Sequence, residues 1–204
     1  METYNKYWAA TLGRGIVAIF AGMAIFVLPQ AINLVFLLPF AILISMMCLA
    51  AYGTVDSVIV LVTSFLIPHH EAGRLALRVQ GVLGTVCGVA LFLLVADRAQ
   101  LSWFLYLAAL QALGAAITEL TVARGTSAHH GSRWCYASAV VAAIAAIALV
   151  SGRNLDPQET AWLLFGYLGA FGITLCLLSA RMLFAERRLQ QDVALRAALV
   201  AAAL

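Results

Sequence analysis

Two stretches of this chain decide its fold, because both are long apolar runs that begin with nearly the same phrase. The first is Arg14-Gly15-Ile16-Val17-Ala18-Ile19-Phe20-Ala21-Gly22-Met23-Ala24-Ile25-Phe26. The second is Gln80-Gly81-Val82-Leu83-Gly84-Thr85-Val86-Cys87-Gly88-Val89-Ala90-Leu91-Phe92. Their repetition indicates that one structural unit occurs more than once along the chain.

The whole chain is too apolar for a water-soluble domain. Of its 204 residues, 64% are hydrophobic and only 10% are charged, and the mean hydropathy is +1.00. Soluble domains have about 25% charged residues, so we expect lipid to be the solvent. Six stretches approach or exceed the roughly 20 apolar residues of a spanning helix, namely 9–28, 44–66, 78–96, 101–122, 134–151 and 161–182.

These runs lack the alternation of a membrane β-barrel, which leaves the helix as the spanning structure. The sequence therefore predicts an all-α polytopic membrane protein with six transmembrane helices. These six helices are expected to group into three helical-hairpin repeats, which form one domain over 1–184. The hairpin units are about 7–67, 74–124 and 132–184.

The connections between spans carry turn-forming and polar residues. The expected outer turns are Pro29-Gln30, 97–100 and 151–157. The apolar stretch from Ala31 to Ile67 would make a helix of about 55 Å, longer than the hydrocarbon core of about 30 Å. We expect an interruption near Pro39, with either a short interfacial or re-entrant helix over 31–43 or a kinked, tilted span.

The segment 185–204 is less apolar than the spans. Residues 189, 193 and 197 are apolar at helical spacing, a pattern typical of an amphipathic helix. We expect a cytoplasmic helix that lies on the membrane or pairs with another subunit.

Basic residues are distributed unevenly between the two sides of the predicted membrane. One side has Lys6, Arg14, Arg74, Arg78, Arg124, Arg133, Arg181, Arg187, Arg188 and Arg196. The other side has only Arg98 and Arg153. The positive-inside rule then predicts that both termini lie in the cytoplasm, and the basic residues on that side are expected to contact membrane lipids.

Composition also argues against several functional classes. No basic cluster is interleaved with aromatics as in a nucleic-acid-binding surface, so we expect no nucleic-acid partner. Each of the four cysteines falls inside a predicted span and none is close to another in sequence, which favours apolar packing over a disulfide framework or zinc site. No nucleotide-binding, metalloprotease or hydrolase motif is present. We therefore expect no enzymatic activity, no metal and no cofactor.

Several motifs resemble those of the HdeD family of bacterial inner-membrane proteins. They are Arg14-Gly15-x-x-Ala18-x-x-x-Gly22 followed by Pro29, Tyr52-x-x-Val55-Asp56, Gly81-x-x-x-x-x-x-Gly88, and Leu164-x-Gly166-Tyr167-x-x-x-Phe171-Gly172-Ile173. The resemblance covers about 7–184 and implies six spans in repeated hairpins and a role in stress or acid resistance. It implies no catalytic residue.

Three charged residues inside the spans are the sharpest candidates for function. Asp56 lies near the centre of its span, where a carboxylate is costly unless it faces a partner or water. It is a candidate for an ion or proton path, although a structural role is favoured, either as a pair with Arg14 or as a cap at a helix break near Gly53. Glu119 either faces the bundle axis or snorkels to the interface, and the interface is favoured. Arg14 is expected to snorkel or to bridge to one of these carboxylates.

Two histidine pairs occur at equivalent hairpin boundaries, His69-His70 and His129-His130. Histidine titrates near neutral pH, so these four residues are candidates for pH sensing. Metal binding is disfavoured because only Glu71 adds a further ligand.

Together these features favour a non-enzymatic HdeD-like membrane protein with a role in envelope or acid-stress tolerance. One alternative is a small transporter or channel that uses Asp56 and Glu119 to pass protons or a small cation. Another is an accessory subunit of a larger membrane complex, and a homo-oligomer is also possible.

Overall fold

The computed structural model describes residues 8–31, 38–67, 74–96, 101–125, 132–152 and 155–202, and their structure is all-α. The described helices are α2 (Trp8–Ala31), α3 (Leu38–Leu66), α4 (Arg74–Ala96), α5 (Leu101–Gly125), α6 (Ser132–Ser151) and α7 (Pro157–Ala202). All six are long and apolar enough to cross a membrane. The predicted fold class and the positions of the six spans are confirmed.

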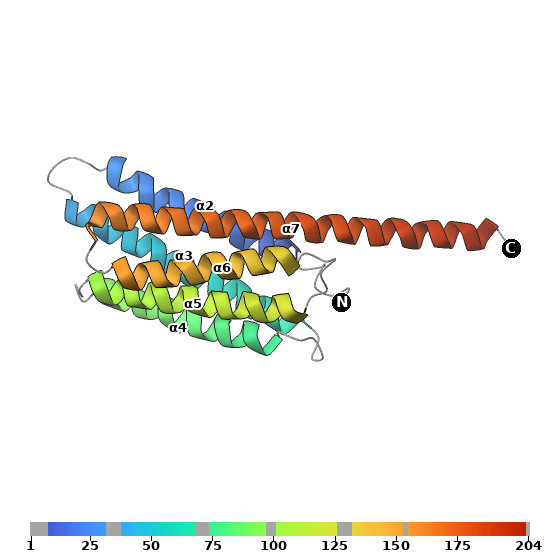
Figure 1. Ribbon diagram of the computed structural model, residues 1–204, viewed down its shortest axis with the longest axis horizontal. Helices are drawn as coiled ribbons and strands as arrows, with labels where there is room; N and C mark the ends of the chain where they lie inside the picture. The colour runs from blue at the N-terminus through green and yellow to red at the C-terminus, as the bar shows by residue number, and fades with distance from the viewer. Residues whose placement is uncertain are drawn as a thin grey trace.

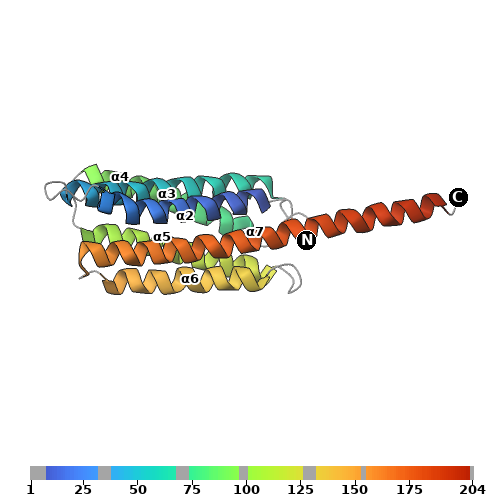
Figure 2. The same ribbon diagram turned by 90° about the horizontal axis from the view of Figure 1, so that it is seen from above.

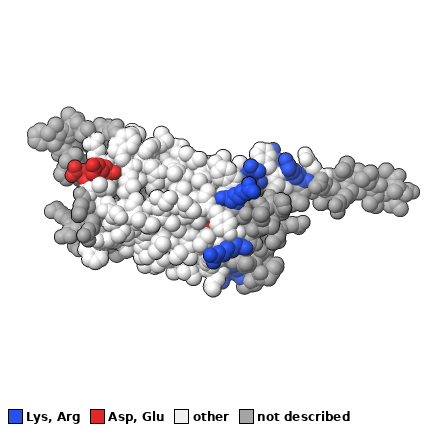
Figure 3. Space-filling view, viewed as in Figure 1, with Lys and Arg blue, Asp and Glu red and all other residues white. Residues whose placement is uncertain are grey.

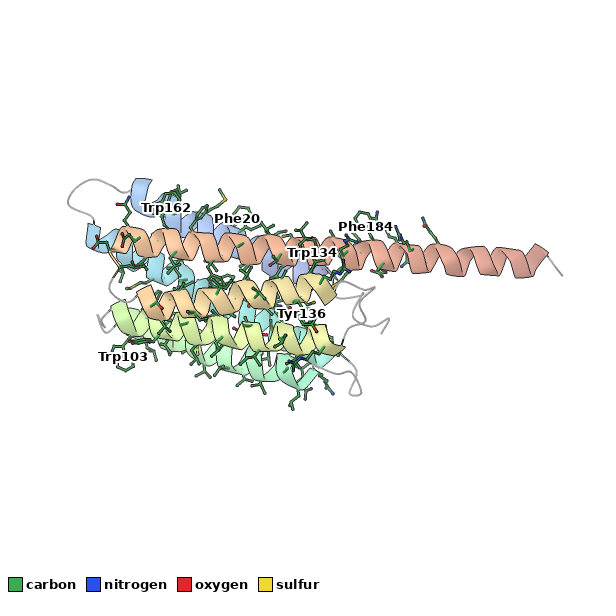
Figure 4. The ribbon with its side chains drawn as sticks, viewed as in Figure 1. Phe20, Trp103, Trp134, Tyr136, Trp162 and Phe184 are labelled. Carbon is green, nitrogen blue, oxygen red and sulfur yellow. The ribbon has the colours of Figure 1, made fainter. Side chains whose placement is uncertain are left out.

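The outside of the bundle is apolar, as a surface in contact with lipid should be. Large apolar side chains project from its helices, among them Phe20, Ile147 and Leu75, which are 67%, 68% and 75% exposed. Aromatic side chains mark both ends of the bundle: Trp103 and Trp162 lie at one end, and Trp134 and Tyr136 lie toward the other (Figure 4). Such belts sit at membrane interfaces.

The helices form a closed ring in which each contacts its neighbours in sequence and α7 contacts α2 (Figures 1 and 2). The most extensive contacts join α3 with α4, α5 with α6, and α2 with α7. These pairs combine helices from different predicted hairpin units, so the tightest packing lies between the hairpins. The ring places one face of every helix toward a common interior.

Glycines allow the backbones of α2 and α7 to approach closely. A Cβ atom on Gly15 would lie 2.8 Å from the Gly172 carbonyl oxygen, and one on Gly172 would lie 2.7 Å from the Gly15 carbonyl oxygen. Gly81 meets the backbone of Leu61 in the same way across α3 and α4. Small residues are the usual means of helix association in lipid. Gly166 and Gly169 on α7, by contrast, have open space where a Cβ would lie.

Helix α7 begins with a capping arrangement. Pro157 occupies the first turn, and the backbone N–H of Asp156 donates to Glu159 Oε2 at 3.3 Å. This is the reciprocal half of a capping box, with proline at a position where a backbone N–H would have no acceptor inside the helix. Helix α7 then continues without a break to Ala202 and projects beyond the other helices (Figure 1). The segment 185–202 is thus an extension of the last span in line with it, whereas the sequence suggested a separate element.

One detail of the first predicted hairpin differs from the structure. The predicted turn at Pro29-Gln30 is wrong, because α2 continues to Ala31. Helix α3 starts at Leu38, so Pro39 lies in its first turn, where proline is tolerated. The predicted interruption before Pro39 falls on residues that the structure does not describe. No separate short helix occurs within the described part of 31–43, and residues 32–37 lie outside the described residues.

Charged side chains separate to opposite ends of the bundle (Figure 3). Arg133 is in the first turn of α6, and Arg181 and Arg188 are in the part of α7 nearest the end from which this helix projects, whereas Asp156 and Glu159 are at the start of α7 and therefore at the other end (Figure 1). We refer to these as the basic end and the acidic end. Lys6, Arg98 and Arg153 lie outside the described residues.

Candidate functional site

Arg14, Asp56 and Glu119 meet inside the ring. Arg14 Nε donates to Asp56 Oδ1 at 2.8 Å, and Arg14 Nη2 donates to Asp56 Oδ2 at 3.4 Å. Arg14 Nη1 donates to Glu119 Oε1 at 3.3 Å. The bridge predicted between Arg14 and Asp56 is confirmed, and the same guanidinium also holds a second carboxylate. We call these three residues the charge cluster.

Glu119 corrects one of the expectations from the sequence. It was expected at the membrane interface, but its side chain is only 6% exposed and contacts Arg14 in the interior. A carboxylate so far from water requires such a partner. The snorkelling interpretation is therefore wrong.

The charges of the cluster do not balance. Two carboxylates share one guanidinium, so one negative charge is left over when all three groups are ionised. Arg14 is the basic side chain that contacts both carboxylates. An uncompensated buried charge is strongly unfavourable. One additional positive charge, either a proton or a cation, would therefore neutralise the cluster.

The imbalance follows from the internal repeat. The residue six positions after the start of the helix is Arg14 in α2, Gln80 in α4 and Ser138 in α6. Asp56 and Glu119 each lie 18 residues after the first residue of α3 and α5. The acidic position is therefore filled twice and the basic position only once, with Gln80 in place of a second arginine.

Two cavities flank the charge cluster. The larger, of about 60 Å³, lies toward the basic end and is lined by Arg14, Glu119, Thr63 and Cys135 among others. The smaller, of about 20 Å³, lies toward the acidic end and is lined by Asp56, Ser57, Gln80 and Gln111 among others. Since a water molecule needs roughly 10–15 Å³ and polar partners, both cavities can hold water.

The smaller cavity contains an unsatisfied acceptor. Gln80 is 6% exposed, and its Oε1 atom has no hydrogen-bond partner among the described residues. Such atoms are rare inside proteins and usually have a partner that the protein itself does not supply. The cavity therefore has both the space and the chemistry for an occupant.

No family model, curated protein or solved structure matches this chain. The likeness to the HdeD family accordingly rests on the motif residues quoted above.

The structure brings together three of the seven candidates from the sequence. His69, His70, His129 and His130 lie outside the described residues, so their role in pH sensing stays a prediction. Within the described part of the chain, no three His, Cys, Asp or Glu residues are grouped to hold a metal ion.

Sequence reasoning quoted Gln80 only as the first residue of the second repeated phrase, and it missed Ser57 and Gln111. The signal was present, because an amide in the middle of an apolar span is costly in the same way as a charge. The sequence does not show that α3, α4 and α5 pack together, and it is this packing that brings the side chains to one cavity.

Proposed function

We propose that this protein is a non-enzymatic, multi-pass protein of a bacterial inner membrane that contributes to envelope or acid-stress tolerance. The observation that carries the proposal is the charge cluster, in which two buried carboxylates share one arginine. A proton taken up by this cluster removes the surplus negative charge and one partner of Arg14. The arrangement suits a protein whose stability or conformation responds to acid, which is also the role implied by the resemblance to the HdeD family.

The charge distribution supports a particular orientation. Described arginines gather at the end from which α7 projects, and basic residues favour the cytoplasmic side. In this orientation both chain termini lie in the cytoplasm, and the larger cavity lies toward the cytoplasm.

The test is survival in acid. A strain of the native host that lacks this gene is complemented with the wild type, Asp56→Asn or Glu119→Gln, at equal membrane levels. We expect the wild type to restore survival and both variants to lose at least half of that effect. Glu186→Gln is the matched control, because this carboxylate lies on the extension of α7 outside the cluster. Full survival with both cluster variants would contradict the proposal.

A second candidate function is a small transporter or channel for protons or a small cation. The two cavities on opposite sides of the cluster favour it, because they place space for water beside each of the two buried carboxylates. Purified protein in liposomes should pass protons, and Asp56→Asn should abolish the flux without changing folding or insertion. Unchanged flux in that variant would exclude a path through Asp56.

A third candidate function is that of an accessory subunit or a homo-oligomer. The extension of α7 past the other helices favours it, because this part of the helix offers a surface to another chain (Figure 2). Purification in mild detergent should then recover a stoichiometric assembly that is lost when 185–204 is deleted. Recovery of a monomer from the full-length chain would argue against this role.

A further inference from the structure

The smaller cavity, lined by Asp56, Ser57, Gln80 and Gln111, has the chemistry of a cation site. These residues supply a carboxylate, a hydroxyl and two amide oxygens. Tyr52 and Tyr167 add two phenol oxygens to the lining. Hard oxygen ligands of this kind suit alkali and alkaline-earth cations, and no thiol or imidazole lines the cavity to favour a transition metal.

The Gln80 side chain independently indicates an occupant. Gln80 is one of the residues that line this cavity, and its Oε1 atom is buried without a donor among the described residues. An amide oxygen is only an acceptor, so it accepts a hydrogen bond or coordinates a cation. Gln80 Oε1 therefore lacks a donor or cation, and the charge cluster lacks one positive charge. Both belong to residues of the ring interior.

Charge and size limit the identity of the occupant. The charge cluster has one surplus negative charge, which a monovalent cation neutralises and a divalent cation would exceed. A cavity of about 20 Å³ accommodates one water-sized particle. A sodium-sized ion fits this space, whereas an organic cation such as choline does not.

We propose that the cavity between Gln80 and Asp56 binds one sodium-sized monovalent cation, with Gln80 Oε1, Ser57 Oγ and the Asp56 carboxylate among its ligands. The ion stands in for the second arginine that the repeat would place at position 80. Its binding requires no transport, so the site is separate from the question of whether ions cross the membrane.

The test is the thermal stability of the purified protein as Na⁺ replaces choline at constant ionic strength. A ligand that binds only the folded state raises the melting temperature with its concentration. We expect this rise in the wild type and a loss of at least tenfold in apparent Na⁺ affinity in Gln80→Leu. Gln158→Leu is the matched control, because Gln158 is an exposed glutamine at the acidic end, and it should behave as the wild type.

A second variant supplies the missing charge covalently. Gln80→Arg should fold, should not respond to Na⁺, and should be at least as stable in choline as the wild type is in choline. Binding of one radioactive ²²Na⁺ per chain in the wild type, but not in Gln80→Arg, would support the same conclusion directly.

The proposal is overturned if the wild type melts at the same temperature in Na⁺, Li⁺ and choline, since the cavity then contains water or a proton. It is also overturned if Gln80→Leu responds to Na⁺ as the wild type does. Neither result bears on acid survival, which depends on the carboxylates of the cluster. Conversely, a failed acid-survival test leaves the sodium titration unaffected.

Discussion

Arg14 and Asp56 form a two-point contact across 42 residues of sequence, with 2.8 Å between Nε and Oδ1 and 3.4 Å between Nη2 and Oδ2. Both side chains are more than nine-tenths buried. The contact ties α2 to α3 in the ring interior and leaves Nη1 of the same guanidinium for Glu119 on α5. One arginine thus links three helices of the ring.

Substitution of Arg14 should therefore strongly lower the free energy of unfolding. Arg14→Leu leaves two buried carboxylates without a counter-charge, and breaking a buried ion pair in this way costs about 3–5 kcal/mol. Arg14→Lys keeps the charge but not the two-point contact, so it should lower the stability less than Arg14→Leu does. Reversible unfolding in lipid bicelles would measure both. Arg14→Leu combined with Asp56→Leu should recover part of the loss, and a double variant less stable than Arg14→Leu would contradict this account.

Gly15 should be intolerant of even a methyl group. In Gly15→Ala the new carbon would lie 2.7 Å from Cys176 Sγ and 2.8 Å from the Gly172 carbonyl oxygen. Separating α2 from α7 should cost about 1–3 kcal/mol, as overpacking of a dense interior does. Gly166→Ala is the control, because its methyl meets open space and alanine favours helix. Equal effects of the two substitutions in the same unfolding assay would refute the close approach.

The continuity of α7 predicts a long distance along one axis. Spin labels at Glu159→Cys and Arg196→Cys should be about 55 Å apart, at 1.5 Å per residue of straight helix. Pulsed electron resonance in nanodiscs would measure this distance in a background with the native cysteines replaced. If the segment after Ala185 bent onto the membrane surface, the distance would fall below about 45 Å.

The proposed orientation predicts opposite labelling of the two ends. Glu159→Cys should react with an impermeant maleimide added outside intact cells, because Glu159 is an exposed residue at the acidic end. Arg188→Cys, at the basic end, should react only after the membrane is opened. Again the native cysteines are replaced first. The reverse pattern would place the termini outside and would invalidate the positive-inside argument.

Much of the fold was predictable because lipid imposes simple rules on a chain. Length and apolarity alone predict each span, and the predicted limits differ from those of the structure by only a few residues at most ends. The predicted helix boundaries were wrong where a proline or a run of polar residues suggested a helix end that the structure does not have. Pro29 looks like a turn but lies in the last turns of α2, and the polar residues after Met182 look like a new element but continue α7.

The charge cluster was predictable only in part. The cost of burying Asp56 indicates a partner, and Arg14 is a plausible one because it lies in the first hairpin. Glu119 could not be assigned, because its depth near the end of α5 is compatible with either the interface or the interior. Its contact with Arg14 depends on which face α5 turns toward the ring.

The sequence by itself determined that this chain is an apolar, six-helix, repeated structure, because backbone hydrogen bonding in lipid allows little else. Tertiary structure alone decided which helices pair, that α7 closes the ring on α2, and that Gln80 lines the same cavity as Asp56. The physical reason is that apolar faces are nearly interchangeable in lipid. Helix pairing therefore depends on glycine contacts and a few buried polar groups, whose partners lie far apart along the chain.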